Sequence, residues 1–242
     1  MNPRRHLTLA ALALGPFVLG LLVVLSAESR AASAIPASDR KALERTLASA
    51  FRALPVPVKE FHQDRSSGTR VIVPGTTARA AAAKAPAEAR QVRVYERLVG
   101  TGEEAEAVGL EVRVYVNQEG TLPEPLASEA GTPQTFTHDG LPGMRVSLAG
   151  VPSGRVALPL TADEAANALT VVRLYVGLPP IEPYLEEIAQ GRQPERTPWD
   201  SRPPRRASEV RTVVVEFQGP RGEVERLVKA TSAAPLRALL SP

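Results

Sequence analysis

Three segments of this chain repeat one alternating pattern, and that alternation limits the fold more than any other feature. They are Val92-Arg93-Val94-Tyr95, Val112-Arg113-Val114-Tyr115 and Val172-Arg173-Leu174-Tyr175. Successive side chains of a β-strand point to opposite faces, so each segment has an aliphatic face and an Arg/Tyr face. We expect the aliphatic faces to enter a core. The Arg/Tyr faces, if the strands are neighbours, would form a cross-strand ladder of guanidinium and phenol groups.

Further strands are expected where short runs rich in aliphatic residues lie between turn residues: Gln134–Thr137, Met144–Leu148, Arg155–Leu160 and Val210–Phe217. The last of these is expected to turn at residues 219–222 into a strand at Glu223–Lys229, which would make a hairpin. A second hairpin is expected to turn through Ala149–Gly154. The sequence therefore predicts a mainly antiparallel sheet.

Helical spacing is found in fewer places. Leu43, Leu47, Phe51 and Leu54 form one stripe, which predicts a helix over Asp39–Leu54 that is capped by Ser38. Shorter helices are expected at a capping box beginning at Thr161 and at Ile181–Gln190. The fold class is thus α+β, predominantly antiparallel β as a sandwich-like or open sheet with a few short helices, preceded by an N-terminal apolar export or anchor helix.

The N-terminal segment has the layout of an export signal. Two arginines precede an uncharged apolar stretch, and a small-residue tract that includes Ala32-Ser33-Ala34 follows it. The apolar stretch Leu7–Ala27 is also long enough to span a bilayer. The sequence leaves both alternatives open, a cleaved signal peptide and an uncleaved anchor. Either one places the rest of the chain outside the cytoplasm, in the periplasm, in the extracellular space or anchored at the inner membrane.

Three parts follow from these patterns. Residues 1–34 are the signal peptide or anchor, residues 35–90 hold a helix and a Pro/Ala-rich linker, and residues 91–242 form a β-rich domain. Within the last part, residues 191–208 are rich in arginine and proline and are expected to form a mobile loop.

Charge and cysteine content exclude several functions. The formal net charge is +3, of which the first 34 residues carry +2, so the remainder is nearly neutral. A neutral body has no general attraction for a polyanion, and this disfavours nucleic acid as a partner. The chain has no cysteine, and this excludes disulfides, thiol catalysis and thiolate metal sites.

Two histidines outside the leader are the candidates for catalysis. His62 lies two residues before Asp64, and His138 precedes Asp139-Gly140, a dipeptide typical of turns. An extracytoplasmic hydrolase would use His62 or His138 with a carboxylate or with a metal ion. No P-loop, dinucleotide fingerprint or EF-hand loop occurs in the sequence, and no cofactor is predicted.

The candidate binding residues are the Arg/Tyr pairs of the three repeated segments and the only tryptophan, Trp199, in the Arg/Pro-rich loop: Arg93, Tyr95, Arg113, Tyr115, Arg173, Tyr175 and Trp199. They favour a non-catalytic envelope protein that binds a partner protein or a cell-wall component. Besides the hydrolase, a second alternative is a membrane-anchored spacer, held through residues 7–27, whose helix over Asp39–Leu54 pairs with a membrane partner.

Overall fold

The computed structural model describes residues 35–64, 68, 70–73, 86–99, 106–117, 133–148, 169–177, 182–190, 192 and 203–242. Within these residues the elements are α2 (Ala37–Ala53), β1 (His62–Gln63), β2 (Arg70–Val73), β3 (Glu88–Val99), β4 (Glu106–Val116), β5 (Gln134–His138), β6 (Leu141–Leu148), β7 (Leu169–Val176), α5 (Glu182–Ala189), β8 (Val213–Pro220), α6 (Arg221–Ala230) and α7 (Ala233–Arg237). Several predictions lie outside the described residues: the leader, the turn at 149–154, the strand at 155–160, the capping box at 161–164 and Trp199.

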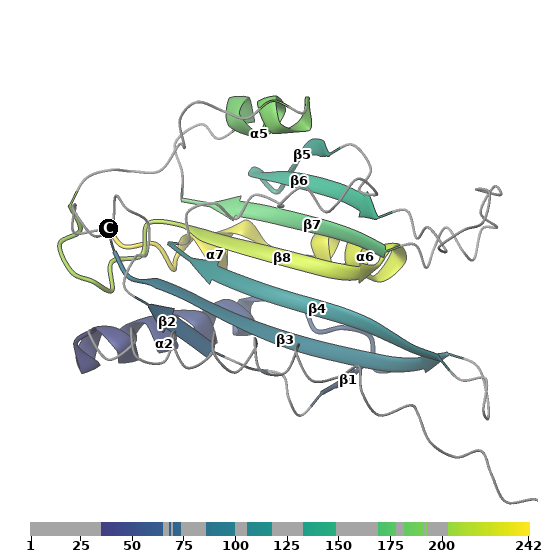
Figure 1. Ribbon diagram of the computed structural model, residues 1–242, viewed down its shortest axis with the longest axis horizontal. Helices are drawn as coiled ribbons and strands as arrows, with labels where there is room; N and C mark the ends of the chain where they lie inside the picture. Colours follow the sequence, from purple (N-terminus) through teal and green to yellow (C-terminus); the bar gives the residue numbers. More distant parts are fainter. Residues whose placement is uncertain are drawn as a thin grey trace, which may run out of the picture.

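The described strands form one eight-stranded antiparallel sheet in the order β1-β3-β4-β8-β7-β6-β5, with β2 also paired to β3. Strands β5, β6 and β7 follow one another in the sheet as they do in the chain. Strand β8 comes last in sequence but lies between β4 and β7 (Figure 1). The expectation of an α+β fold built mainly on an antiparallel sheet is confirmed.

Helices α2, α6 and α7 cover one face of the sheet and enclose the main core with it (Figure 1). Valines and leucines of β4, β7 and β8 supply the sheet side of this core, and every residue of β8 except Gln218 is buried. Helix α5 packs on the opposite face, where Tyr184 and Leu185 contact Met144, Tyr175 and Val214 in a second, smaller apolar cluster.

The helix predicted over Asp39–Leu54 is confirmed as α2, and its stripe of Leu43, Leu47 and Phe51 is buried. The predicted cap is wrong. The N-cap is Pro36, and no side chain caps the helix. Ser38 falls inside the first turn because the helix begins two residues before Asp39.

The hairpin predicted after β8 is also wrong. Residues 221–230 form the helix α6, whose buried side chains Val224, Leu227 and Val228 recur at helical spacing. Pro220 ends the strand and takes the N-cap position with φ −57°. The lack of a backbone N–H in Pro220 does not destabilise α6, because the first N–H groups of a helix have no hydrogen-bond partner within the helix.

The β5–β6 hairpin turns through Asp139 and Gly140, as the Asp-Gly dipeptide predicts. Both residues have positive φ, 48° and 70°, which is the backbone of the two-residue turn that matches strand twist. The Asp139 carboxylate accepts a hydrogen bond from the Ala233 backbone N–H at 2.7 Å. The turn is therefore tied to the start of α7.

Candidate binding surface

Three strands bring a row of charged side chains together on the face opposite α2, α6 and α7. In the register of the sheet, Glu216 of β8 pairs with Arg113 of β4 on one side and with Arg173 of β7 on the other. Paired residues of neighbouring strands project to the same face. We call Arg113, Glu216 and Arg173 the charged triad.

The carboxylate of Glu216 joins the two arginines. One oxygen, Oε1, lies 2.6 Å from Arg113 Nη1, and the other, Oε2, lies 2.5 Å from Arg173 Nε. Only 1% of the Glu216 side chain is exposed, compared with 12% for Arg173 and 28% for Arg113. The triad is therefore buried at Glu216 and half-buried at Arg173, and Arg113 is the member most open to solvent.

Arg113 has further partners on its open side. Its guanidinium also donates to Glu111 and, at 3.1 Å, to Gln218 Oε1. Burial alone would lower the pKa of Arg113, but Glu216 and Glu111 raise it above the ordinary value. The charge is thus permanent, and its orientation is held by acceptors on two strands.

The next row of the same face is aromatic. Tyr115 and Tyr175 both pair with Val214, one from each neighbouring strand. Tyr175 is buried against α5, whereas Tyr115 is half-buried beside the triad, with its Oη 3.5 Å from Glu216 Oε1. Burial raises the pKa of both phenols, and Glu216 raises that of Tyr115 further. Both hydroxyl groups are therefore protonated at neutral pH.

Two donors of this face have no hydrogen-bond partner among the described residues. They are Arg173 Nη1 and the Tyr175 hydroxyl, and both atoms are buried. The great majority of buried polar atoms in proteins are hydrogen-bonded. Leaving one unpaired costs about 1–3 kcal/mol, so these two positions fit an acceptor supplied from outside the described chain.

The structure separates the three repeated segments. Arg113, Tyr115, Arg173 and Tyr175 lie on one face, with their aliphatic neighbours in the core as expected. The segment Val92–Tyr95 has its two faces exchanged. Arg93 pairs with Val112, which puts Arg93 and Tyr95 on the core face. The expected ladder of three neighbouring Arg/Tyr faces is therefore wrong.

The segment Val92–Tyr95 fits the core through α2. The Arg93 guanidinium lies 4.3 Å from the centroid of the Phe51 ring, and Tyr95 is buried in the main core. The cation is thus accommodated by an aromatic face rather than by a carboxylate. A role for Arg93, Tyr95 or Trp199 in binding stays a prediction.

The two candidate catalytic histidines lie apart from the triad. His62 is exposed on β1, at the far edge of the sheet from β5. His138 ends β5, and its Nε2 donates to the Thr231 backbone carbonyl at 2.9 Å. No group of three or more acidic or histidine side chains suited to a metal ion occurs among the described residues. The hydrolase alternative stays a prediction that no described contact favours.

Glu216, the residue on which the triad depends, is not among the binding residues predicted from the sequence. A signal was present: Glu216 is the only charged residue in the run Val213–Phe217. A carboxylate in the middle of an apolar strand is almost never buried unless it is paired. That rule would have predicted a cationic partner on a neighbouring strand, although not which one.

In the part of the chain that the structure describes, no helix is long and apolar enough to cross a membrane. Comparisons of the chain with models of protein families, with curated proteins and with solved structures gave no match in any of the three.

Proposed function

We propose that this chain is an exported, non-catalytic binding module of the cell envelope. Its binding surface is the face formed by β4, β8 and β7 around the charged triad. The observation that carries the proposal is the buried carboxylate of Glu216, which fixes two arginines in one row of the sheet beside two donors that have no partner among the described residues.

Stability alone does not account for such a triad. Replacing a buried arginine–glutamate–arginine cluster with apolar residues of similar volume is often neutral, or stabilising by about 1–4 kcal/mol. The same row of the sheet already continues in Met144, which pairs with Arg173. An apolar row would therefore suit this position, and a charged row is better explained by recognition.

The chemistry of the face defines the partner. A guanidinium held flat by carboxylates and a neutral phenol beside it donate hydrogen bonds and offer a stacking surface. They suit carboxylate or carbonyl oxygens on a partner protein, or the hydroxyl and carboxylate groups of a cell-wall component. The face bears no excess of positive charge, since Glu111 and Glu216 balance Arg113 and Arg173, and this disfavours nucleic acid.

Export is part of the proposal and rests on the leader. Arg4 and Arg5 would hold the N-terminus in the cytoplasm under either alternative for the apolar stretch. The binding module then lies in the periplasm or outside the cell. It is free if the leader is cleaved and tethered through residues 7–27 if it is not.

A variant that removes the charge but keeps the volume tests the surface. It combines Arg113→Met, Arg173→Met and Glu216→Leu, and the control Arg40→Met changes an exposed residue of α2. The measurements are co-sedimentation with purified cell-wall sacculi and cross-linking in intact envelopes. We expect the triad variant to stay folded and to lose at least about tenfold in binding, or about 1.4 kcal/mol, while the control binds normally. Unchanged binding of a folded triad variant to every partner would remove this surface from the proposal.

A further inference from the structure

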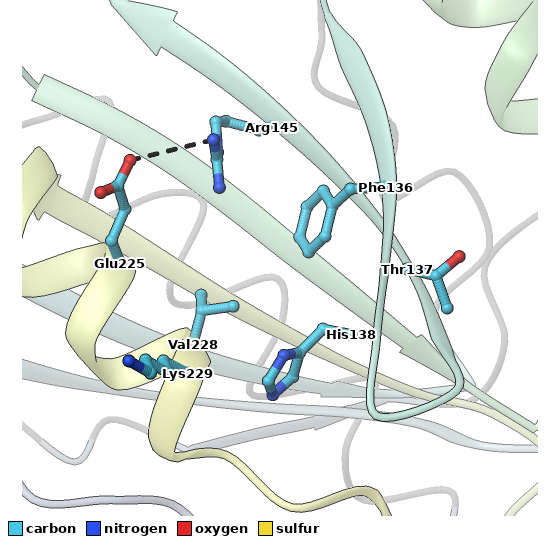
Figure 2. Close-up of a pocket in the computed structure, with 7 residues that line it drawn as sticks. All are labelled: Phe136, Thr137, His138, Arg145, Glu225, Val228 and Lys229. Carbon is cyan, nitrogen blue, oxygen red and sulfur yellow. Dashed lines mark ion pairs between the residues drawn. The ribbon is translucent and has the colours of Figure 1, made fainter.

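A pocket of about 360 Å³ lies on the other face of the sheet, between the β5–β6 hairpin and helix α6. It is lined by Phe136, Thr137, His138, Arg145, Glu225, Val228 and Lys229 (Figure 2). Its volume is within the range of small-molecule sites. The pocket is independent of the charged triad, because Phe136 and Arg145 project to the side that carries α6.

The apolar wall of the pocket is built by Phe136 from the hairpin and Val228 from α6. In Figure 2 the Phe136 ring and the His138 ring face α6, whereas Thr137 points away, as the alternation of a strand requires. The Phe136 ring lies directly over Gly143 of β6, where an added Cβ would be 2.6 Å from the ring. The glycine therefore leaves the space that sets the position of the ring.

The polar wall contains Arg145, which has a donor without a hydrogen-bond partner among the described residues. Arg145 Nη1 is 3.8 Å from Glu225 Oε1, which is beyond hydrogen-bond distance. Glu225 instead accepts a hydrogen bond from Arg221 at 2.8 Å. Arg145 Nε is buried and has no partner among the described residues, and its guanidinium lies 5.4 Å from the centroid of the Phe136 ring.

The remaining charges give the pocket a positive balance. Among the described lining residues, Arg145 and Lys229 are cationic and Glu225 is the one carboxylate. His138 donates through Nε2 to the Thr231 carbonyl, which fixes its ring as part of the wall. One surplus positive charge beside an aromatic ring suits a ligand with one negative charge and an apolar body.

We infer that this pocket binds a small monocarboxylate with an aromatic or branched apolar group. The carboxylate would accept hydrogen bonds from the Arg145 guanidinium, and the apolar group would lie against Phe136 and Val228. Lys229 adds attraction at the rim of the pocket. The pocket thus combines three features: an arginine with a donor that has no partner among the described residues, an aromatic wall and an open cavity.

Titration of the full-length protein with phenylacetate, followed by calorimetry and by NMR signals of the pocket residues, tests the inference. Phenylacetamide has the same shape without the charge, and phenethylamine reverses it. We expect saturable binding of phenylacetate in roughly the millimolar range, with the amide weaker by at least about tenfold and no binding of the amine. Absence of saturable binding, or equal binding of the amide, would overturn the inference.

Two variants complete the test. Arg145→Met should weaken phenylacetate binding by at least about tenfold. Lys229→Glu alters an exposed side chain, so it keeps the fold even if Arg145→Met does not, and it should weaken binding by roughly threefold or more. The triad variant should bind phenylacetate normally, which separates a failure of this inference from a failure of the proposed function. Normal binding by both pocket variants would place the ligand elsewhere.

Discussion

At the scale of single residues, Glu216 is a buried carboxylate that holds two half-buried arginines in this sheet. Its two oxygens each accept a hydrogen bond from a different arginine, and 1% of its side chain is exposed. Removing the carboxylate leaves both guanidinium groups without their central acceptor. The energetic role of this residue is therefore larger than that of an exposed ion pair.

We predict that Glu216→Gln lowers the free energy of unfolding by about 3–5 kcal/mol, the usual cost of breaking a buried ion pair from one side. Glu44→Gln is the matched control, because Glu44 forms an exposed pair with Arg40 on α2 and should change stability by less than about 1 kcal/mol. Urea unfolding gives both values. The apolar triad variant should recover most of the loss, and equal stability of Glu216→Gln and the wild type would show that the buried pairs are not formed.

The tyrosines predict how stability depends on alkaline pH. Burial raises the pKa of Tyr115, Tyr175 and Tyr184, three of the four tyrosines. The folded state then retains phenolic protons that the unfolded state releases above about pH 10, so unfolding releases protons and stability falls as pH rises.

We predict a decline in the unfolding free energy above about pH 10, measured by urea unfolding, together with late ionisation of these phenols in the near-ultraviolet spectrum. Tyr175→Phe should reduce the slope of that decline. It should not destabilise the protein at neutral pH, because the hydroxyl that it removes has no partner among the described residues. An unchanged slope in Tyr175→Phe would contradict the assignment.

At the scale of elements, local pattern predicted the helix α2 and the Asp-Gly turn but not the helix α6. The stripe from Leu43 to Leu54 extends over about three helical turns, and its period cannot be taken for that of a strand. In residues 219–230 the Gly-Pro-Arg-Gly sequence indicated a turn between two strands, and this outweighed the helical spacing of Val224, Leu227 and Val228. A proline at the boundary is compatible with both structures, so tertiary packing decides between them.

Helix α2 gives the sharpest test at this scale. Its Leu47 is fully buried in the core that α2 shares with the sheet and α7. The stripe that the spacer hypothesis assigns to a membrane partner is thus packed in the chain's own core. We predict that Leu47→Ala lowers the unfolding free energy by about 3 kcal/mol. Arg45→Ala, on the exposed side of the same helix, should cost less than about 0.5 kcal/mol, and equal small effects would mean that α2 does not contribute to the core.

At the scale of the whole molecule, the site depends on strand order, which local pattern does not contain. Arg113 and Arg173 meet because β8, the last strand in sequence, lies between β4 and β7. The period of two showed which side chains share a face of each strand, and this was correct for all three repeated segments. The period did not show which face of a strand is directed into the core. In β3 the Arg93 guanidinium lies on the core side, where it packs over the Phe51 ring of α2. The partners of a buried charge are thus fixed by long-range pairing.

The predicted cleavage site lies directly before Ile35. The side chain of Ile35 is 9% exposed and belongs to the main core. Cleavage after Ala34 would leave Ile35, a residue of the main core, as the first residue of the chain. A small-residue motif ends at that position, as signal peptidases require.

We predict that protein recovered from fractionated cells has an intact mass that corresponds to a start near Ile35 and is found in the soluble envelope fraction. The double substitution Ala32→Arg and Ala34→Arg should block cleavage, because the cleavage site needs small residues. The full-length protein should then be found in the membrane fraction. A full-length wild-type mass in the membrane fraction would mean that residues 7–27 anchor the chain, and its binding partners should then be sought at the membrane. A full-length mass in the cytoplasmic fraction would contradict export, and with it the envelope part of the proposed function.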